Sequence, residues 1–166
     1  QCVHIDDASA FKLFQALASN IIVNKLVLSF NRNITPTGWV ACFRVLLGSQ
    51  TALEEIHFGS NGGIDDEGAY LLANLLSTHM STVRLLDVQF NSLITTNGWR
   101  ACPTPLIEVK RVMEIGNEDY DGIDIQINDD VILGFVAALA SNNPLTEFSI
   151  GHVDISASSL DALVNV

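Results

Sequence analysis

The residues best suited to bind a metal ion lie together in one acidic segment, residues 118–124. Its four carboxylates surround Gly122 and could supply oxygen ligands to a hard cation such as calcium. However, the spacing is not that of an EF-hand loop, and no glutamate stands where the closing bidentate ligand would be needed. We therefore interpret the segment as a solvated acidic loop, and the sequence predicts no metal site.

Paired aspartates are a second pattern that could do chemistry, because two adjacent carboxylates can act as general acid and base. Each pair stands, however, directly before an apolar pattern of helical spacing. At a helix N-terminus such residues cap free backbone N–H groups and interact favourably with the helix dipole. We therefore interpret all three pairs as helix starts: Asp6-Asp7, Asp65-Asp66 and Asp129-Asp130.

The four histidines do not indicate a metal site or a catalytic centre either. They stand at unrelated positions of the repeat described below, and neither His57 nor His152 has a cysteine or carboxylate at metal-ligand spacing. The chain also contains no nucleophile elbow, Walker loop or dinucleotide-binding glycine pattern. The sequence therefore predicts a protein that is not an enzyme and that binds no cofactor.

Composition restricts the class of protein further. Hydrophobic residues make up 48% of the 166 residues and charged residues only 16%, which is typical of a folded domain with a core. No apolar run reaches the roughly 18–20 residues of a membrane span, and the first residues lack the pattern of a signal peptide. A net charge of −11 argues against nucleic acid and anionic membranes as ligands and favours a basic partner.

An internal repeat organises the chain. Asn31, Asn61 and Asn91 each close the same phrase, in which apolar residues stand five and three positions before the asparagine. An isoleucine follows each asparagine by three residues, and a helical apolar pattern comes after it. Weaker copies extend the series, so that intervals of 28–33 residues separate six anchoring isoleucines, which predicts a repeat protein. These isoleucines are Ile5, Ile34, Ile64, Ile94, Ile127 and Ile155.

Each repeat unit predicts a strand, a turn and a helix. The alternation around Ile56 and Phe58 is typical of a strand with one buried face. The asparagine then turns the chain, because its amide can bond backbone groups that a loop would leave unpaired. The residue after each anchoring isoleucine is a favoured helix N-cap, and Pro36 suits the first position of a helix. The six caps are Asp6, Thr35, Asp65, Thr95, Asn128 and Ser156.

The third unit carries the most complete motif, which runs from Leu53 to Leu76 as Leu-x-x-Ile-x-Phe-x-x-Asn-x-x-Ile-x-x-x-Gly-x-x-x-Leu-x-x-x-Leu. This motif resembles the ribonuclease-inhibitor class of leucine-rich repeat. The resemblance covers nearly the whole chain and implies an α/β fold. It would be a right-handed solenoid with a parallel sheet on its concave face and helices on its convex face. It also implies one domain over residues 1–166 with five to six units, and the incomplete ends indicate a segment of a longer repeat protein.

Two types of unit alternate along the chain. The phrase Thr-x-x-Gly-Trp follows Ile34 and recurs after Ile94, whereas the units between them begin with Asp-Asp or Asn-Asp-Asp. Large and small residues should therefore alternate in the core, since Trp39 and Trp99 share a helix position with Ala10 and Ala69. The fourth unit is irregular: Pro103 and Pro105 should end its helix early, and an insertion near residues 117–126 follows.

The three cysteines are expected to be free thiols. Cys42 and Cys102 fall on the buried stripe of their helices, two units apart, which exceeds the roughly 7 Å that a disulfide can span between Cα atoms. Cys2 lies more than a further unit from Cys42. Buried free thiols fit an intracellular, reducing compartment.

The candidate binding surface is the concave face of the sheet, where the residues between the buried ones of each strand should point. Two phenylalanines among small and acidic residues predict a protein-binding strip, although both rings could instead pack into the turn beside the asparagine. The candidate partner-binding residues are Phe30, Glu55, His57, Asp87, Gln89, Phe90, Glu114, Ser149 and His152.

The sequence therefore predicts a scaffold that binds another protein, one with a basic surface. A regulator of an enzyme is the alternative, because the same class of repeat includes GTPase-activating proteins that act through polar loop residues at one edge; Arg32 and Asn33 lie on the corresponding edge. A structural subunit is a third reading, in which the ends of the chain stack on flanking repeats or on a neighbouring subunit.

Overall fold

The computed structural model describes residues 5–79, 82–101, 112–116, 133–134, 137, 147–151 and 156–164. Helices and strands alternate along most of this part of the chain. The helices are α1 (Asp7–Ala18), α2 (Pro36–Leu46), α3 (Asp66–His79), α4 (Thr96–Ala101) and α7 (Ala157–Val164). The strands are β1 (Lys25–Val27), β2 (Glu55–His57), β3 (Leu85–Asp87), β4 (Val112–Gly116) and β5 (Glu147–Gly151).

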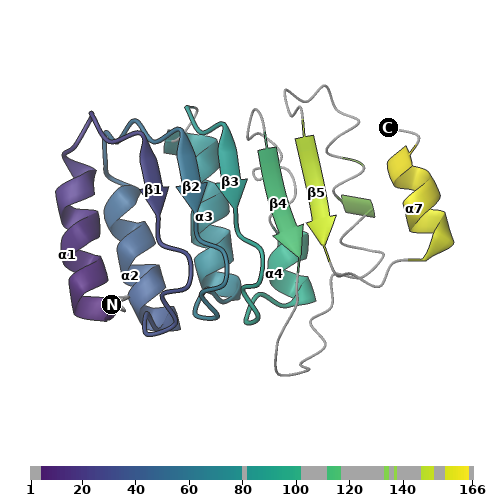
Figure 1. Ribbon diagram of the computed structural model, residues 1–166, viewed down its shortest axis with the longest axis horizontal. Coiled ribbons are helices and arrows are strands. Elements are labelled where there is room, and N and C mark those ends of the chain that lie inside the picture. Colours follow the sequence, from purple (N-terminus) through teal and green to yellow (C-terminus); the bar gives the residue numbers. More distant parts are fainter. Residues whose placement is uncertain are drawn as a thin grey trace.

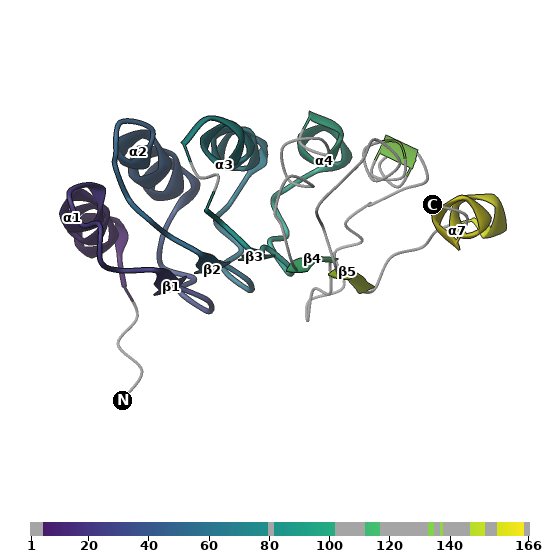
Figure 2. The same ribbon diagram turned by 90° about the horizontal axis from the view of Figure 1, so that it is seen from above.

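The strands form one parallel sheet in the order β1-β2-β3-β4-β5. The sequence prediction of parallel strands near Leu26, Ile56, Leu86, Met113 and Phe148 is confirmed, because these five residues pair in one row across the sheet. The labelled helices lie side by side on one face of this sheet (Figures 1 and 2). We call the opposite face, which no described helix covers, the open face.

The core lies between the sheet and the helices. The middle residue of each of β1, β2 and β3 is buried in the core. The anchoring isoleucines Ile34, Ile64 and Ile94 are at most 2% exposed. Ile5, in the first unit, is only partly buried. The large and small residues predicted to alternate between helices are all buried: Ala10, Trp39, Ala69 and Trp99. Phe14 of α1 packs edge-on against Trp39 and Phe43 of α2, with ring centroids 6.3 Å apart in both pairs.

The predicted helix caps are confirmed at every described position. Asp6, Thr35, Asp65, Thr95 and Ser156 each accept a hydrogen bond from a backbone N–H two or three residues later. Pro36 occupies the first position of α2, as predicted. Each of these caps follows an anchoring isoleucine and stands directly before a helix. The caps therefore mark where the described helices begin.

Several predictions lie outside the described residues. They concern Ile127, Asn128 and Ile155, the prolines at 103 and 105, the insertion near residues 117–126, and Cys2 and Cys102. Cys42 is described, and it is buried and free, as predicted. No helix in the described part of the chain is both long enough and apolar enough to cross a membrane.

Candidate functional site

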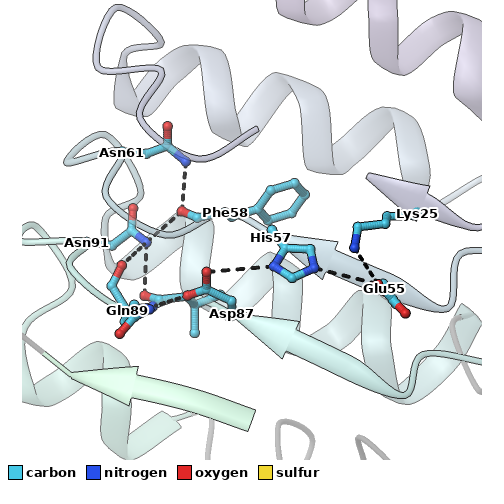
Figure 3. Close-up of polar contacts among 9 residues, drawn as sticks. Lys25, Glu55, His57, Phe58, Asn61, Asp87, Gln89 and Asn91 are labelled. Atoms are coloured by element: carbon cyan, nitrogen blue, oxygen red, sulfur yellow. Dashed lines mark hydrogen bonds and ion pairs between the residues drawn. The ribbon is translucent and has the colours of Figure 1, made fainter. Parts of the chain in front are cut away.

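The asparagines follow the first three strands, and their side chains form hydrogen bonds within each turn and to the neighbouring unit. The Nδ2 of Asn61 donates to the Phe58 carbonyl at 2.7 Å, and the Nδ2 of Asn91 donates to the same carbonyl at 3.0 Å (Figure 3). The Oδ1 of Asn61 accepts from the backbone N–H of Asn31 at 2.7 Å, thirty residues earlier. The predicted role of asparagine in turning the chain is therefore confirmed, and the same side chain also bonds the adjacent unit.

The open face carries a charged row that crosses three strands. Lys25 and Val27 flank the buried Leu26 and are exposed, whereas Glu55 and His57 flank Ile56 and are partly buried. The Nζ of Lys25 lies 2.8 Å from the Oε2 of Glu55. That same oxygen lies 3.8 Å from Nε2 of His57 on the same strand, so one carboxylate faces both Lys25 of β1 and His57 of β2 (Figure 3).

The Lys25 ammonium changes the acidity of its partner. It donates a hydrogen bond to Glu55, and this bond lowers the pKa of the Glu55 carboxyl; burial opposes the shift and His57 adds to it. Glu55 therefore stays ionised to lower pH than an isolated glutamate. Its negative charge is paired with the positive charge of Lys25 on the open face.

Asp87 occupies the other side of His57. Its Oδ2 lies 3.9 Å from His57 Nδ1, and its Oδ1 accepts from the backbone N–H of Gln89 at 3.2 Å. The residue is only 8% exposed, so the carboxylate lies low in the face rather than projecting from it. Gly59 makes room for it, because a Cβ at Gly59 would lie 2.7 Å from Asp87 Oδ1.

The residue before each asparagine has an unusual backbone conformation. Phe30, Ser60 and Phe90 have φ values of 64°, 60° and 57°, which place all three in the left-handed region. Phe30 is 66% exposed, so its ring does not pack into the turn, which was the alternative prediction. Phe90 is partly buried.

The structure brings four of the nine predicted binding residues into one register. His57 pairs with Asp87, Asp87 with Glu114, and Glu114 with Ser149, so their Cα atoms form one row over β2 to β5. Gln89 and Phe90 lie in the turn after β3 and are partly buried, and His152 lies outside the described residues. Arg32 and Asn33, which the enzyme-regulator alternative needs, are exposed in the loop between β1 and α2.

Two residues of the open face did not enter the sequence prediction as candidate binding residues. Lys25 pairs with Glu55, and Val27 is 57% exposed next to His57 in the sheet. The alternation around Leu26 predicts that both side chains point away from the core into the groove. Among the described residues, no group of three histidine, cysteine, aspartate or glutamate side chains could hold a metal ion.

Comparison with known proteins finds a family match for the third unit. Residues 49–73 match a family described as Leucine Rich repeat, and this range contains Leu53, Ile56, Phe58, Asn61, Ile64 and Gly68 of the repeated motif. No curated protein matches the chain. Leucine-rich repeats generally mediate protein-protein interaction and are typically not enzymes. The match and the parallel strand–helix units support a leucine-rich repeat protein with an α/β repeat fold.

Proposed function

We propose that this chain is a protein-binding scaffold and that its partner docks on the open face of the sheet. In this proposal residues 1–166 form one right-handed solenoid of the ribonuclease-inhibitor-like class, and the open face is its concave side. The observation that supports it best is the surface that β1, β2 and β3 present. Exposed Val27 lies beside the ion pair of Lys25 and Glu55 and beside His57, on the face that no described helix covers. An apolar contact within a polar surround is the usual anatomy of a protein interface.

The charge on this face favours a basic partner. On the open face of β1 to β3, the Glu55 carboxylate is paired with Lys25, and the Asp87 carboxylate lies beside His57. The whole chain carries a net charge of −11, which adds a long-range attraction for cations. Complementary charges of this kind mainly speed association and make binding sensitive to salt.

Site-specific photo-crosslinking tests the location of the interface. A benzoylphenylalanine at Val27 should form a covalent adduct with a defined partner in extract from the native source. The same group at Tyr70, which is 57% exposed on α3, should not form that adduct. An adduct formed from Tyr70 alone would move the interface to the helix side and refute the proposal.

Charge reversal then tests the acidic character of the site with the partner identified above. Glu55→Lys should weaken the complex and reduce its dependence on salt, because one attractive charge is lost. Glu67→Lys on α3 is the control, since Glu67 is also an ion-paired glutamate but is exposed on a helix. Equal effects of the two substitutions would show that net charge alone, and not the open face, governs binding.

A further inference from the structure

The loop before β1 exposes two large apolar side chains. Ile22 is 85% exposed and Ile21 is 69% exposed, the highest values among the large apolar residues of the described chain. Thr51 stands at the position of Ile21 in the loop before β2, thirty residues later, and it is only 8% exposed. The loop before β2 lies against the loop before β1, because the backbone N–H of Glu54 donates to the Asn24 carbonyl at 2.7 Å. Among the described residues, no segment lies against the outer side of the loop before β1 in this way.

The strand that follows this loop lies at one end of the sheet. β1 pairs with β2 on one side, and no described strand pairs with its other side (Figure 1). The backbone N–H groups of Leu28 and Phe30 donate to carbonyls in and after β2, at 2.8 and 3.1 Å. Alternate residues of a parallel strand bond to opposite sides, so the backbone N–H and C=O groups of Lys25 and Val27 point away from β2. Such a row of free backbone groups is a template for a further strand.

The stretch of chain that contains this strand is locally positive. Residues 8–35 contain Lys12, Lys25 and Arg32 but no aspartate or glutamate, although the whole chain has a net charge of −11. Lys25 is paired with Glu55. Arg32, in contrast, is exposed in the turn after β1, and no described residue forms an ion pair with it. An exposed cation therefore follows β1, and two exposed isoleucines precede it.

These features select the chemistry of the segment that would occupy this side of β1. An extended segment satisfies the free backbone groups of the strand, whereas a helix already uses its own. Apolar side chains of the segment would cover Ile21 and Ile22, and a carboxylate would pair with Arg32. A second copy of the chain fits less well, because it would bring the same exposed cation to this side and the same net charge of −11.

We propose that the outer side of β1, from Ile21 to Arg32, binds an extended acidic and apolar segment of a partner protein, which adds a strand to the sheet. We call this surface the β1 edge. The apolar side chains of the segment lie on Ile21 and Ile22, and a carboxylate pairs with Arg32. The β1 edge is a different surface from the open face, so this inference does not rest on the proposed function. It assigns the protein a second interface with the opposite charge preference.

Amide hydrogen exchange, followed by NMR, tests the geometry of the β1 edge. In the folded chain alone, the N–H of Val27 should exchange fast, and that of Leu28, which is bonded to β2, should exchange slowly. Peptides are then selected from a random twelve-residue library displayed on phage. Acidic peptides with alternating apolar residues should be among them, and one of these at saturation should slow the exchange of Val27 roughly tenfold or more.

Two outcomes of this experiment would overturn the inference. Slow exchange of Val27 in the protein alone would show that the chain itself or a second copy already covers the β1 edge. Failure of every selected peptide to protect Val27 would show that the edge accepts no strand. Basic peptides that leave Val27 unprotected but lose affinity with Glu55→Lys would support the proposed function while the β1 edge fails.

Surface substitutions test the chemistry of the segment, with the affinity of the selected acidic peptide measured by fluorescence anisotropy. Ile22→Ser should weaken binding roughly tenfold, because an apolar side chain is lost from the interface. Tyr70→Ser, at an exposed residue of α3, should leave the affinity unchanged. Arg32→Glu should also weaken binding, whereas Arg44→Glu, which changes the net charge equally but lies on α2, should not. Equal effects of each variant and its control would overturn the inference.

Discussion

Neighbouring units are joined in two different ways on the helix side of the molecule. Between α1 and α2, Asp7 reaches the start of the next unit: its Oδ1 accepts from the backbone N–H of Thr35 at 2.7 Å and its Oδ2 from the Thr35 hydroxyl at 2.6 Å. Between α3 and α4, Asp66 makes the same two bonds to Thr95, at 2.6 and 2.7 Å. We call this arrangement the carboxylate clamp.

The junction between α2 and α3 lacks the aspartate that the carboxylate clamp requires. Pro36 stands where the clamping aspartate would be, and its side chain carries no acceptor. Instead, Gly63 packs against the preceding unit, where an added Cβ would lie 2.1 Å from the Ile34 carbonyl oxygen. An exposed ion pair, Arg44–Glu67 at 2.7 Å, also joins α2 and α3.

The difference explains why two unit types alternate. A unit that begins with Asp-Asp caps its own helix with the first carboxylate and the next unit with the second. The next unit must then offer a threonine and a glycine, since a Cβ at Gly38 would lie 2.1 Å from Asp7 Oδ1 and one at Gly98 would lie 2.3 Å from Asp66 Oδ1. The clamp therefore joins the first unit to the second and the third unit to the fourth.

The largest expected effect concerns Cys42, which lies on α2 between the two kinds of junction. Burial raises the pKa of its thiol to about 12, with a smaller contribution from the charge of Asp7, and the residue is 0% exposed. A thiol reagent can reach it only when the units open, so labelling at pH 8 should be roughly 10³-fold or more slower than in urea. Site-resolved mass spectrometry measures this rate. Similar rates in the two states would mean that α2 is not held by its junctions.

Substitution of Gly63 should destabilise the junction that lacks a clamp. The added Cβ of Gly63→Ala meets a backbone carbonyl and the Trp39 ring, which cannot move without displacing the core, so we expect a loss of about 3 kcal/mol in unfolding free energy. Gly48→Ala is the matched control, because nothing lies within 4 Å of a Cβ there. Urea denaturation of both variants measures the difference. An equal effect would show that close packing at Gly63 does not join the two units.

The sequence predicted the elements inside each unit better than the contacts between units. Asparagine turns, helix caps and the buried stripe depend on residues within one motif, and the prediction held at Asn61, Asp65 and Ile64. Asp7 and Asp66 were interpreted only as helix starts, since their partners lie 28 and 29 residues away. The co-occurrence of Asp-Asp with Thr-x-x-Gly in the following unit was the available signal.

The same limit applies to the candidate site. Alternation of side chains predicted which residues face away from the core, and Glu55 and His57 do so. It did not predict that Asp87 is 8% exposed, because that depends on the missing side chain of Gly59, which follows the adjacent strand. Nor did it predict the left-handed backbone of Phe30, which follows from the turn that the asparagine fixes.

Removal of a clamping carboxylate should have an intermediate effect. Asp7→Ala and Asp66→Ala each lose two charge-assisted hydrogen bonds at a partly exposed site, so we expect a loss of about 1–2 kcal/mol per substitution. A double-mutant cycle between Asp7 and Thr35 measures the coupling directly by chemical denaturation. Additive effects of the two substitutions would refute the clamp as an interaction between units.

The smallest effect is expected at the exposed ion pair of the unclamped junction. The side chains of Arg44 and Glu67 are 63% and 56% exposed, so water and salt screen their attraction and the pair contributes little. Arg44→Met, which keeps the apolar stem, should change the unfolding free energy by less than about 0.5 kcal/mol, and by less still in 1 M salt. Denaturation of the wild type and the variant at low and high salt measures the change in unfolding free energy. Asp7→Ala, which removes a carboxylate clamp, is the reference for a larger effect. A loss at Arg44 equal to that at Asp7 would reverse the ranking, because surface charge rather than capping and close packing would then hold the units together.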